Sequence, residues 1–188
     1  MTQHSDLVSP MAASQSTRRS AARLAQLSGE IVLSDSMLNI NAGWGDLILD
    51  SVEEAILEAD VSAAAQGSVS ITRIRRPQIG EHRPHEWIDR LSAENVAAVV
   101  VTAGDCATCT SRAVRECILA EEAGIPATAV VPQGLNEIIH ATLHAWGRPG
   151  LRVATFQTPI FALKRAGFPG AMQSTAREVV AILTSPQG

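Results

Sequence analysis

The sequence predicts an α/β protein, a three-layer sandwich with helices on both faces of a mainly parallel, five-stranded sheet. Short β-like runs alternate along the chain with longer segments of helical periodicity, and this alternation is typical of parallel strands joined by right-handed crossovers. The run AAVVVT at residues 97–102 is continuously apolar. Such a run is typical of a central strand that is covered on both faces.

Each element of this sandwich is predicted from a local pattern. Strands are expected at residues 29–35, 68–75, 97–102, 126–131 and 151–155. Helices are expected at residues 46–59, 85–94, 109–123, 136–146 and 175–183. Pro84 suits the start of the second helix, and Gly124 suits the end of the third. Five strands in this arrangement predict a flavodoxin-like sheet.

The length of 188 residues fits one domain of ordinary size. Residues 1–27 are rich in Ser, Ala, Gln and Arg, so we expect a mobile N-terminal arm, with a short helix over residues 17–27, before a single α/β domain at 28–188. The formal charge of −4 argues against a nucleic-acid surface. No stretch approaches the roughly 18 apolar residues of a membrane span, and no secretory signal is evident, so we expect a cytoplasmic protein without a membrane partner.

Two loops of the predicted sheet carry polar residues to one place. In a sheet of order 2-1-3-4-5, ligands bind beyond the carboxyl ends of the first and third strands. The loop after the third strand contains Gly104, Asp105 and Cys106. The loop after the first strand contributes a set of polar residues that also serve as ordinary turn formers, namely Asp35, Ser36, Asn39 and Asn41. We expect a small polar substrate in this crevice, with Thr158, after the fifth strand, shaping its wall.

The motif Cys106-Ala-Thr-Cys109 lies at a predicted strand-to-helix turn. Unpaired N–H groups at a helix start stabilise an anion, so a thiolate is favoured there, and a thiolate is both a nucleophile and a metal ligand. Ionised Asp105 opposes this effect. A second cysteine three residues on can resolve a covalent intermediate by closing a disulfide. Hydroxyl donors in the same turn complete the predicted substrate-binding set: Thr108, Thr110 and Ser111. The alternative without a chemical function is that Cys106 and Cys109 are small residues used for tight packing. Cys117 is expected to fill the core.

The stretch VVVTAGDCATCTSRAVRECILAEEAGIPATAVV, residues 99–131, resembles the UGSC family. Members carry Sec-Gly-Ser-Cys-Thr-Ser, or a cysteine form of it, between an apolar strand and a helix that ends in Gly-Ile-Pro. Cys106 falls at the first position of that motif and Cys109 at the second cysteine. Ala107, Thr108 and Arg112 depart from the usual glycine, serine and tryptophan. The similarity extends more weakly over most of residues 29–185.

The resemblance implies a nucleophilic or redox role for Cys106 with Cys109 as its partner. A more distant similarity to the selenoprotein B subunit of glycine and sarcosine reductases implies attack on a carbon–heteroatom bond. We therefore expect an enzyme of reductive or thiol-transfer chemistry. We also expect it to be a homo-oligomer or one subunit of a hetero-oligomeric enzyme, because a shallow single-domain pocket is often completed across an interface.

Three alternatives remain open at the level of sequence. Cys106 and Cys109 could bind zinc or copper in a metal-dependent enzyme or a non-catalytic metal or redox sensor, and His140 and His144, which share one helix face, could join them. No cofactor is otherwise implied. A faint similarity of residues 101–111 to aspartate/glutamate racemase-like proteins would make one cysteine a proton-transfer base. No cysteine follows Cys117 to act as a second base. A thioredoxin-like reductase is disfavoured, because no aromatic residue precedes the motif.

Overall fold

The computed structural model describes residues 20–35, 44–62, 68–75, 83–157 and 167–185. Strands and helices alternate along the chain, as the sequence predicts. The strands are β1 (Gly29–Asp35), β2 (Val69–Arg75), β3 (Ala98–Thr102), β4 (Ala127–Pro132) and β5 (Ala154–Phe156). The helices are α1 (Trp44–Ser62), α2 (Pro84–Ala93), α3 (Ala107–Glu122), α4 (Asn136–Ala145), which follows the short 3-10 turn η4 (Gln133–Leu135), and α5 (Phe168–Thr184).

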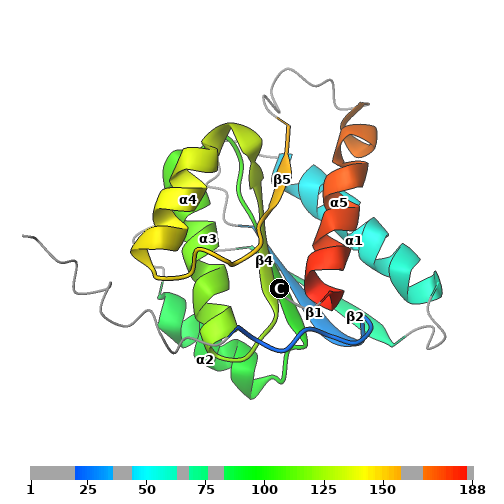
Figure 1. Cartoon of the computed structure of the whole chain (residues 1–188). Coiled ribbons are helices and arrows are strands. Elements are labelled where there is room, and N and C mark those ends of the chain that lie inside the picture. The colour runs from blue at the N-terminus through cyan, green and yellow to red at the C-terminus, as the bar shows by residue number, and fades with distance from the viewer. Residues whose placement is uncertain (1–19, 36–43, 63–67, 76–82, 158–166, 186–188) are drawn as a thin grey trace, which may run out of the picture.

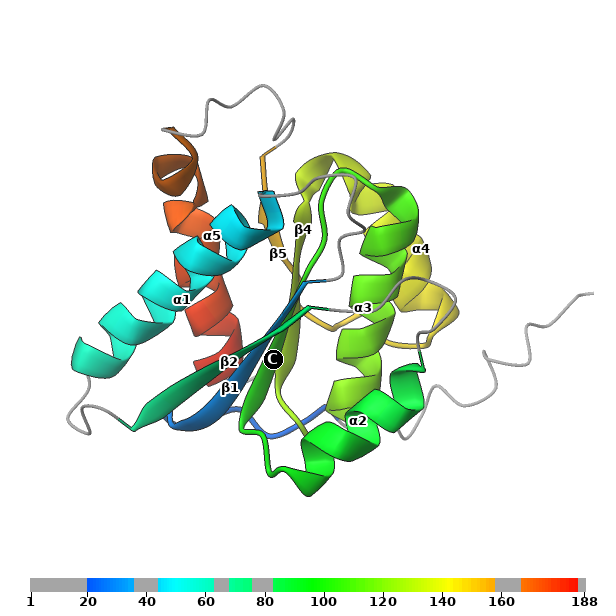
Figure 2. The same cartoon turned by 180° about the vertical axis from the view of Figure 1, so that it is seen from behind.

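The five strands form one parallel sheet in the order β2-β1-β3-β4-β5. Helices α1 and α5 cover one face, and α2, α3 and α4 cover the other (Figures 1 and 2). This arrangement confirms the predicted flavodoxin-like three-layer sandwich. The strand order reverses between β1 and β3, which places the ligand crevice of this architecture at their carboxyl ends.

The continuous apolar run of β3 serves both layers of the core. Val99 and Val101 pack beneath α2 and α3, whereas Ala98 and Val100 face the core beneath α1 and α5. All five residues of the strand are buried. Cys117 is fully buried on the inner side of α3, so the prediction that it fills the core is confirmed.

Boundaries differ where packing or capping overrides the local pattern. Helix α5 begins at Phe168, seven residues before the predicted start, because Phe168 is itself fully buried and Pro169 suits a first turn. Helix α3 begins at Ala107 because Cys106 caps it. Strand β5 is limited to the residues that pair with β4, from Ala154 to Phe156.

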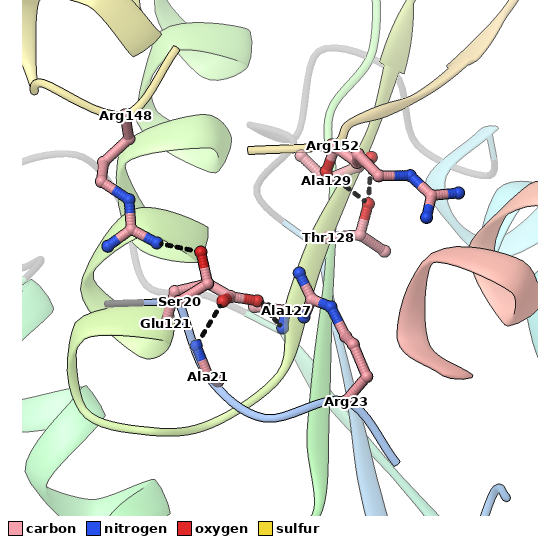
Figure 3. Close-up of polar contacts among 9 residues, drawn as sticks. All are labelled: Ser20, Ala21, Arg23, Glu121, Ala127, Thr128, Ala129, Arg148 and Arg152. Atoms are coloured by element: carbon pink, nitrogen blue, oxygen red, sulfur yellow. Dashed lines mark hydrogen bonds and ion pairs between the residues drawn. The ribbon is translucent and has the colours of Figure 1, made fainter. Parts of the chain in front are cut away.

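The described part of the N-terminal arm departs from prediction. Residues 20–27 form no helix, and they are held against the domain rather than free. Glu121, at the end of α3, accepts a hydrogen bond from the backbone N–H of Ala21 (2.9 Å) and forms an ion pair with Arg23 (Figure 3). Arg148 donates to the hydroxyl of Ser20 at 2.8 Å. Residues 1–19 lie outside the described part of the chain.

Among the described residues, no helix is both long enough and apolar enough to cross a bilayer.

Candidate active site at the carboxyl edge of the sheet

The loop that carries the first cysteine leaves the sheet beside the end of β1. Asp35, the last residue of β1, pairs in register with Thr102, the last residue of β3. The backbone N–H of Ala103 remains bonded to Val130 of β4 at 3.0 Å. The chain then turns tightly, since the N–H of Cys106 donates to the carbonyl of Gly104 at 2.6 Å. Asp35, Gly104 and Asp105 therefore all lie at the carboxyl edge of the sheet, at the ends of β1 and β3, as the topology predicts.

Asp35 lies against the first turn of α1. An added Cβ on Gly45 would stand only 2.5 Å from Oδ2 of Asp35, so the carboxylate occupies the space that a side chain at position 45 would need. A negative charge is favoured near a helix N-terminus by the unpaired N–H groups and the helix dipole. Gly45 is thus a site residue that the sequence analysis missed, because a glycine in a helix start carries no chemical signal of its own.

Cys106 is the N-cap residue of α3. Its backbone is extended, with φ −138° and ψ 114°, and its Sγ accepts a hydrogen bond from the N–H of Cys109 at 3.2 Å. Its carbonyl accepts from the N–H of Thr110 at 2.9 Å. The sulfur therefore takes the place that a serine or aspartate oxygen usually fills at a helix start. The helix start thus presents a backbone N–H donor directly to that sulfur.

The three cysteine side chains differ in their exposure to solvent. None of the three cysteines forms a disulfide, and Cys106 is half-buried, whereas Cys109 is 4% exposed and Cys117 is fully buried. Cys109 lies under Cys106, on the inner face of the first turn of α3. A reagent in solvent therefore reaches Cys106 first. The backbone N–H of Cys109 contacts the Cys106 sulfur, and the Cys109 side chain is shielded from solvent.

The hydroxyl residues of the motif point in different directions. Thr110 is fully buried, inside the domain. Thr108 and Ser111 instead line a groove of about 680 Å³ between α3 and α4, with Arg112, Arg115 and Trp146. The sequence predicts both hydroxyls beside Cys106 but gives no indication that the two arginines or the tryptophan belong to the site. No local signal connects α3 with Trp146, which follows α4.

Several predicted residues are not joined to the site. Ser36, Asn39, Asn41 and Thr158 lie outside the described residues. His140 and His144 are both exposed on α4. Within the described ranges, no group of three or more His, Cys, Asp or Glu side chains is arranged to hold a metal ion. The structure therefore does not bring Cys106, Cys109, His140 and His144 together as one such group.

Comparison with known proteins agrees with the resemblance noted around the cysteine motif. A search of curated proteins finds no match. The UGSC family model matches residues 6–185, which is nearly the whole chain and includes every element of the sheet. A cysteine-capped helix after the third strand, within a match of this extent, shows that the chain belongs to the UGSC family.

Proposed function

We propose that this chain is a thiol-dependent enzyme that acts on a small polar substrate. Cys106 is the nucleophile, and Cys109 is the resolving thiol. The observation that carries the proposal is the N-cap position of the Cys106 sulfur, which is half-exposed and accepts the N–H of Cys109 at 3.2 Å. Nucleophilic cysteines are activated in this way at helix N-termini.

The unequal burial of the two thiols supports their division of roles. A nucleophile must meet the substrate, and of the two thiols Cys106 is the more exposed. A resolving thiol has to reach only the sulfur of its partner, which agrees with the buried position of Cys109. Asp35, at the end of β1, lies at the same edge of the sheet and suits a polar group of a substrate.

The reaction class is reductive cleavage of a carbon–heteroatom bond, R–X. The Cys106 thiolate attacks the carbon, the C–X bond breaks, and X leaves with the bonding electrons and takes a proton. The Cys109 thiolate then attacks the Cys106 sulfur, the S–C bond breaks, and the carbon takes a proton. Two thiols and R–X thus yield R–H, H–X and one disulfide. An external dithiol must then reduce that disulfide before the next cycle.

A single-turnover experiment tests this sequence with phenacyl bromide, whose carbon is electrophilic and whose departing carbanion is an enolate. Reduced protein, freed of small thiols, is mixed with one equivalent of the probe at neutral pH. We expect acetophenone, bromide and a Cys106–Cys109 disulfide, as seen by mass spectrometry of the intact and digested protein. Cys109→Ser should stop at a stable phenacyl thioether on Cys106.

Two variants provide the controls. Cys106→Ser keeps an oxygen acceptor at the N-cap, so the helix should persist while the reaction is lost. Cys117→Ala removes a thiol from the core and should leave the reaction intact. Equal alkylation of Cys106 and Cys109 in the folded protein, or undiminished acetophenone from Cys106→Ser, would refute the assignment.

A further inference from the structure

The groove between α3 and α4 has two chemically different walls. Helix α3 contributes Arg112 and Arg115, and helix α4 contributes the apolar side chains of Ile138, Ala141 and Ala145. Among the described residues, no acidic side chain lines it. At about 680 Å³, its volume falls within the range of small-molecule sites.

Arg115 is held in a fixed orientation inside this groove. Its Cζ lies 5.8 Å from the ring centroid of Trp146, so the guanidinium is placed over the aromatic face. Its Nε is buried and has no hydrogen-bond partner among the described residues. Stacking occupies the face of the guanidinium and leaves the N–H groups at its edge available to a planar acceptor.

Arg112 is held in place by an ion pair with a buried carboxylate. Its side chain is only 10% exposed, and its Nε donates to Oε1 of the fully buried Glu116 at 3.0 Å. Its Nη2 is buried without a hydrogen-bond partner in the described part of the chain. Both arginines line the groove, so their guanidinium groups present positive charge and N–H donors to an anion that enters it.

We propose that this groove binds the carboxylate group of a small organic monoacid. Arg112 and Arg115 donate to the carboxylate, and the apolar wall of α4 contacts the hydrocarbon part. Two arginines and the buried Glu116 leave one net positive charge, which matches a monoanion better than a dianionic phosphate. Arginine forks fit planar carboxylates. This binding goes beyond the proposed thiol reaction and does not require a reactive Cys106.

The test is an NMR titration with pentanoate, acetate and inorganic phosphate at constant ionic strength. The resonances followed are the indole N–H of Trp146 and the Nε–H of both arginines. We expect saturable pentanoate binding with a millimolar Kd, weaker acetate binding, and no comparable phosphate binding. Each methylene that reaches the α4 wall should tighten binding by up to about fourfold.

Matched variants identify the groove as the binding site. Arg115→Gln should weaken pentanoate binding at least about tenfold. Arg115→Lys, which keeps the charge but not the fork, should also weaken it. Arg90→Gln is the control, because Arg90 forms a similar i,i+4 pair with Glu94 (3.2 Å) on the exposed side of α2. That variant should bind as the wild type does.

The outcomes separate this inference from the thiol proposal. Pentanoate should bind unchanged to Cys106→Ser, whatever that variant does to phenacyl bromide. Absence of saturable binding, equal affinity for phosphate and pentanoate, or equal losses in Arg115→Gln and Arg90→Gln would each overturn the carboxylate site.

Discussion

Replacement of Glu121 by glutamine should destabilise the protein severely without touching the cysteine motif. The Glu121 side chain is fully buried. Its Oε1 accepts from the N–H of Ala127 (2.8 Å) and pairs with Arg23, while its Oε2 accepts from the N–H of Ala21 (2.9 Å). A glutamine has one carbonyl oxygen in place of two acceptors. In either orientation, its NH2 group therefore faces at least one of these donors.

The size of the effect follows from the burial of both partners. The Arg23 side chain is 4% exposed and that of Glu121 is 0% exposed. Removal of one member of a buried ion pair costs about 3–5 kcal/mol, because the other charge stays buried without compensation. For a chain of this size, each kcal/mol lowers Tm by about 2–4 °C, so Glu121→Gln should lower Tm by roughly 6–20 °C.

Urea unfolding, followed by circular dichroism, measures this loss. The matched control is Glu122→Gln, which changes the exposed neighbouring carboxylate of the same helix and should stay within about 0.5 kcal/mol of the wild type. Arg23→Gln combined with Glu121→Gln should cost less than the sum of the single changes. A loss below about 1 kcal/mol for Glu121→Gln, or strict additivity in the double variant, would refute the reasoning.

Glu121 and Cys106 are at opposite ends of α3, roughly 22 Å apart at 1.5 Å per residue. Alkylation of Cys106 by iodoacetamide in the folded Glu121→Gln protein should therefore proceed at the wild-type rate. A large change in that rate would show that the N-terminal anchor and the cysteine motif are coupled.

Three further substitutions test the local geometry. Gly45→Ala should destabilise the protein by about 1–3 kcal/mol, because its Cβ would stand 2.5 Å from Asp35 Oδ2. In an Asp35→Ala background the same change should be neutral or stabilising. A stabilising effect in the wild type would contradict the contact. Gly124→Ala should cost about 1–2 kcal/mol of stability because the residue has a φ of +85°. Steric contact adds nothing, since an added Cβ would meet no atom within 4 Å. An unchanged stability in urea unfolding would contradict this backbone cost. Cys117→Ala should cost about 1–2 kcal/mol through a small cavity, with the alkylation rate of Cys106 unchanged.

Local patterns in the sequence determined the order of elements, the layer architecture and the position of the cysteine motif. The apolar run of β3 specifies a strand covered on both faces, and Gly124 ends α3 in the positive-φ conformation that favours glycine. A motif between such a strand and the following helix has to lie at the carboxyl edge of the sheet. These inferences need only neighbouring residues, because secondary structure and crossover handedness follow from short-range geometry.

Tertiary structure alone decided which charged groups are buried and which surfaces face one another. In the sequence, Glu121 stands in an ordinary charged segment of α3; it becomes a buried anchor through contact with residues 98 and 100 positions earlier. Arg112 and Arg115 likewise acquire a groove only because α4 and Trp146 pack beside them. Such contacts join segments far apart in the chain, and periodicity within one segment carries no information about the partner that folding brings to it.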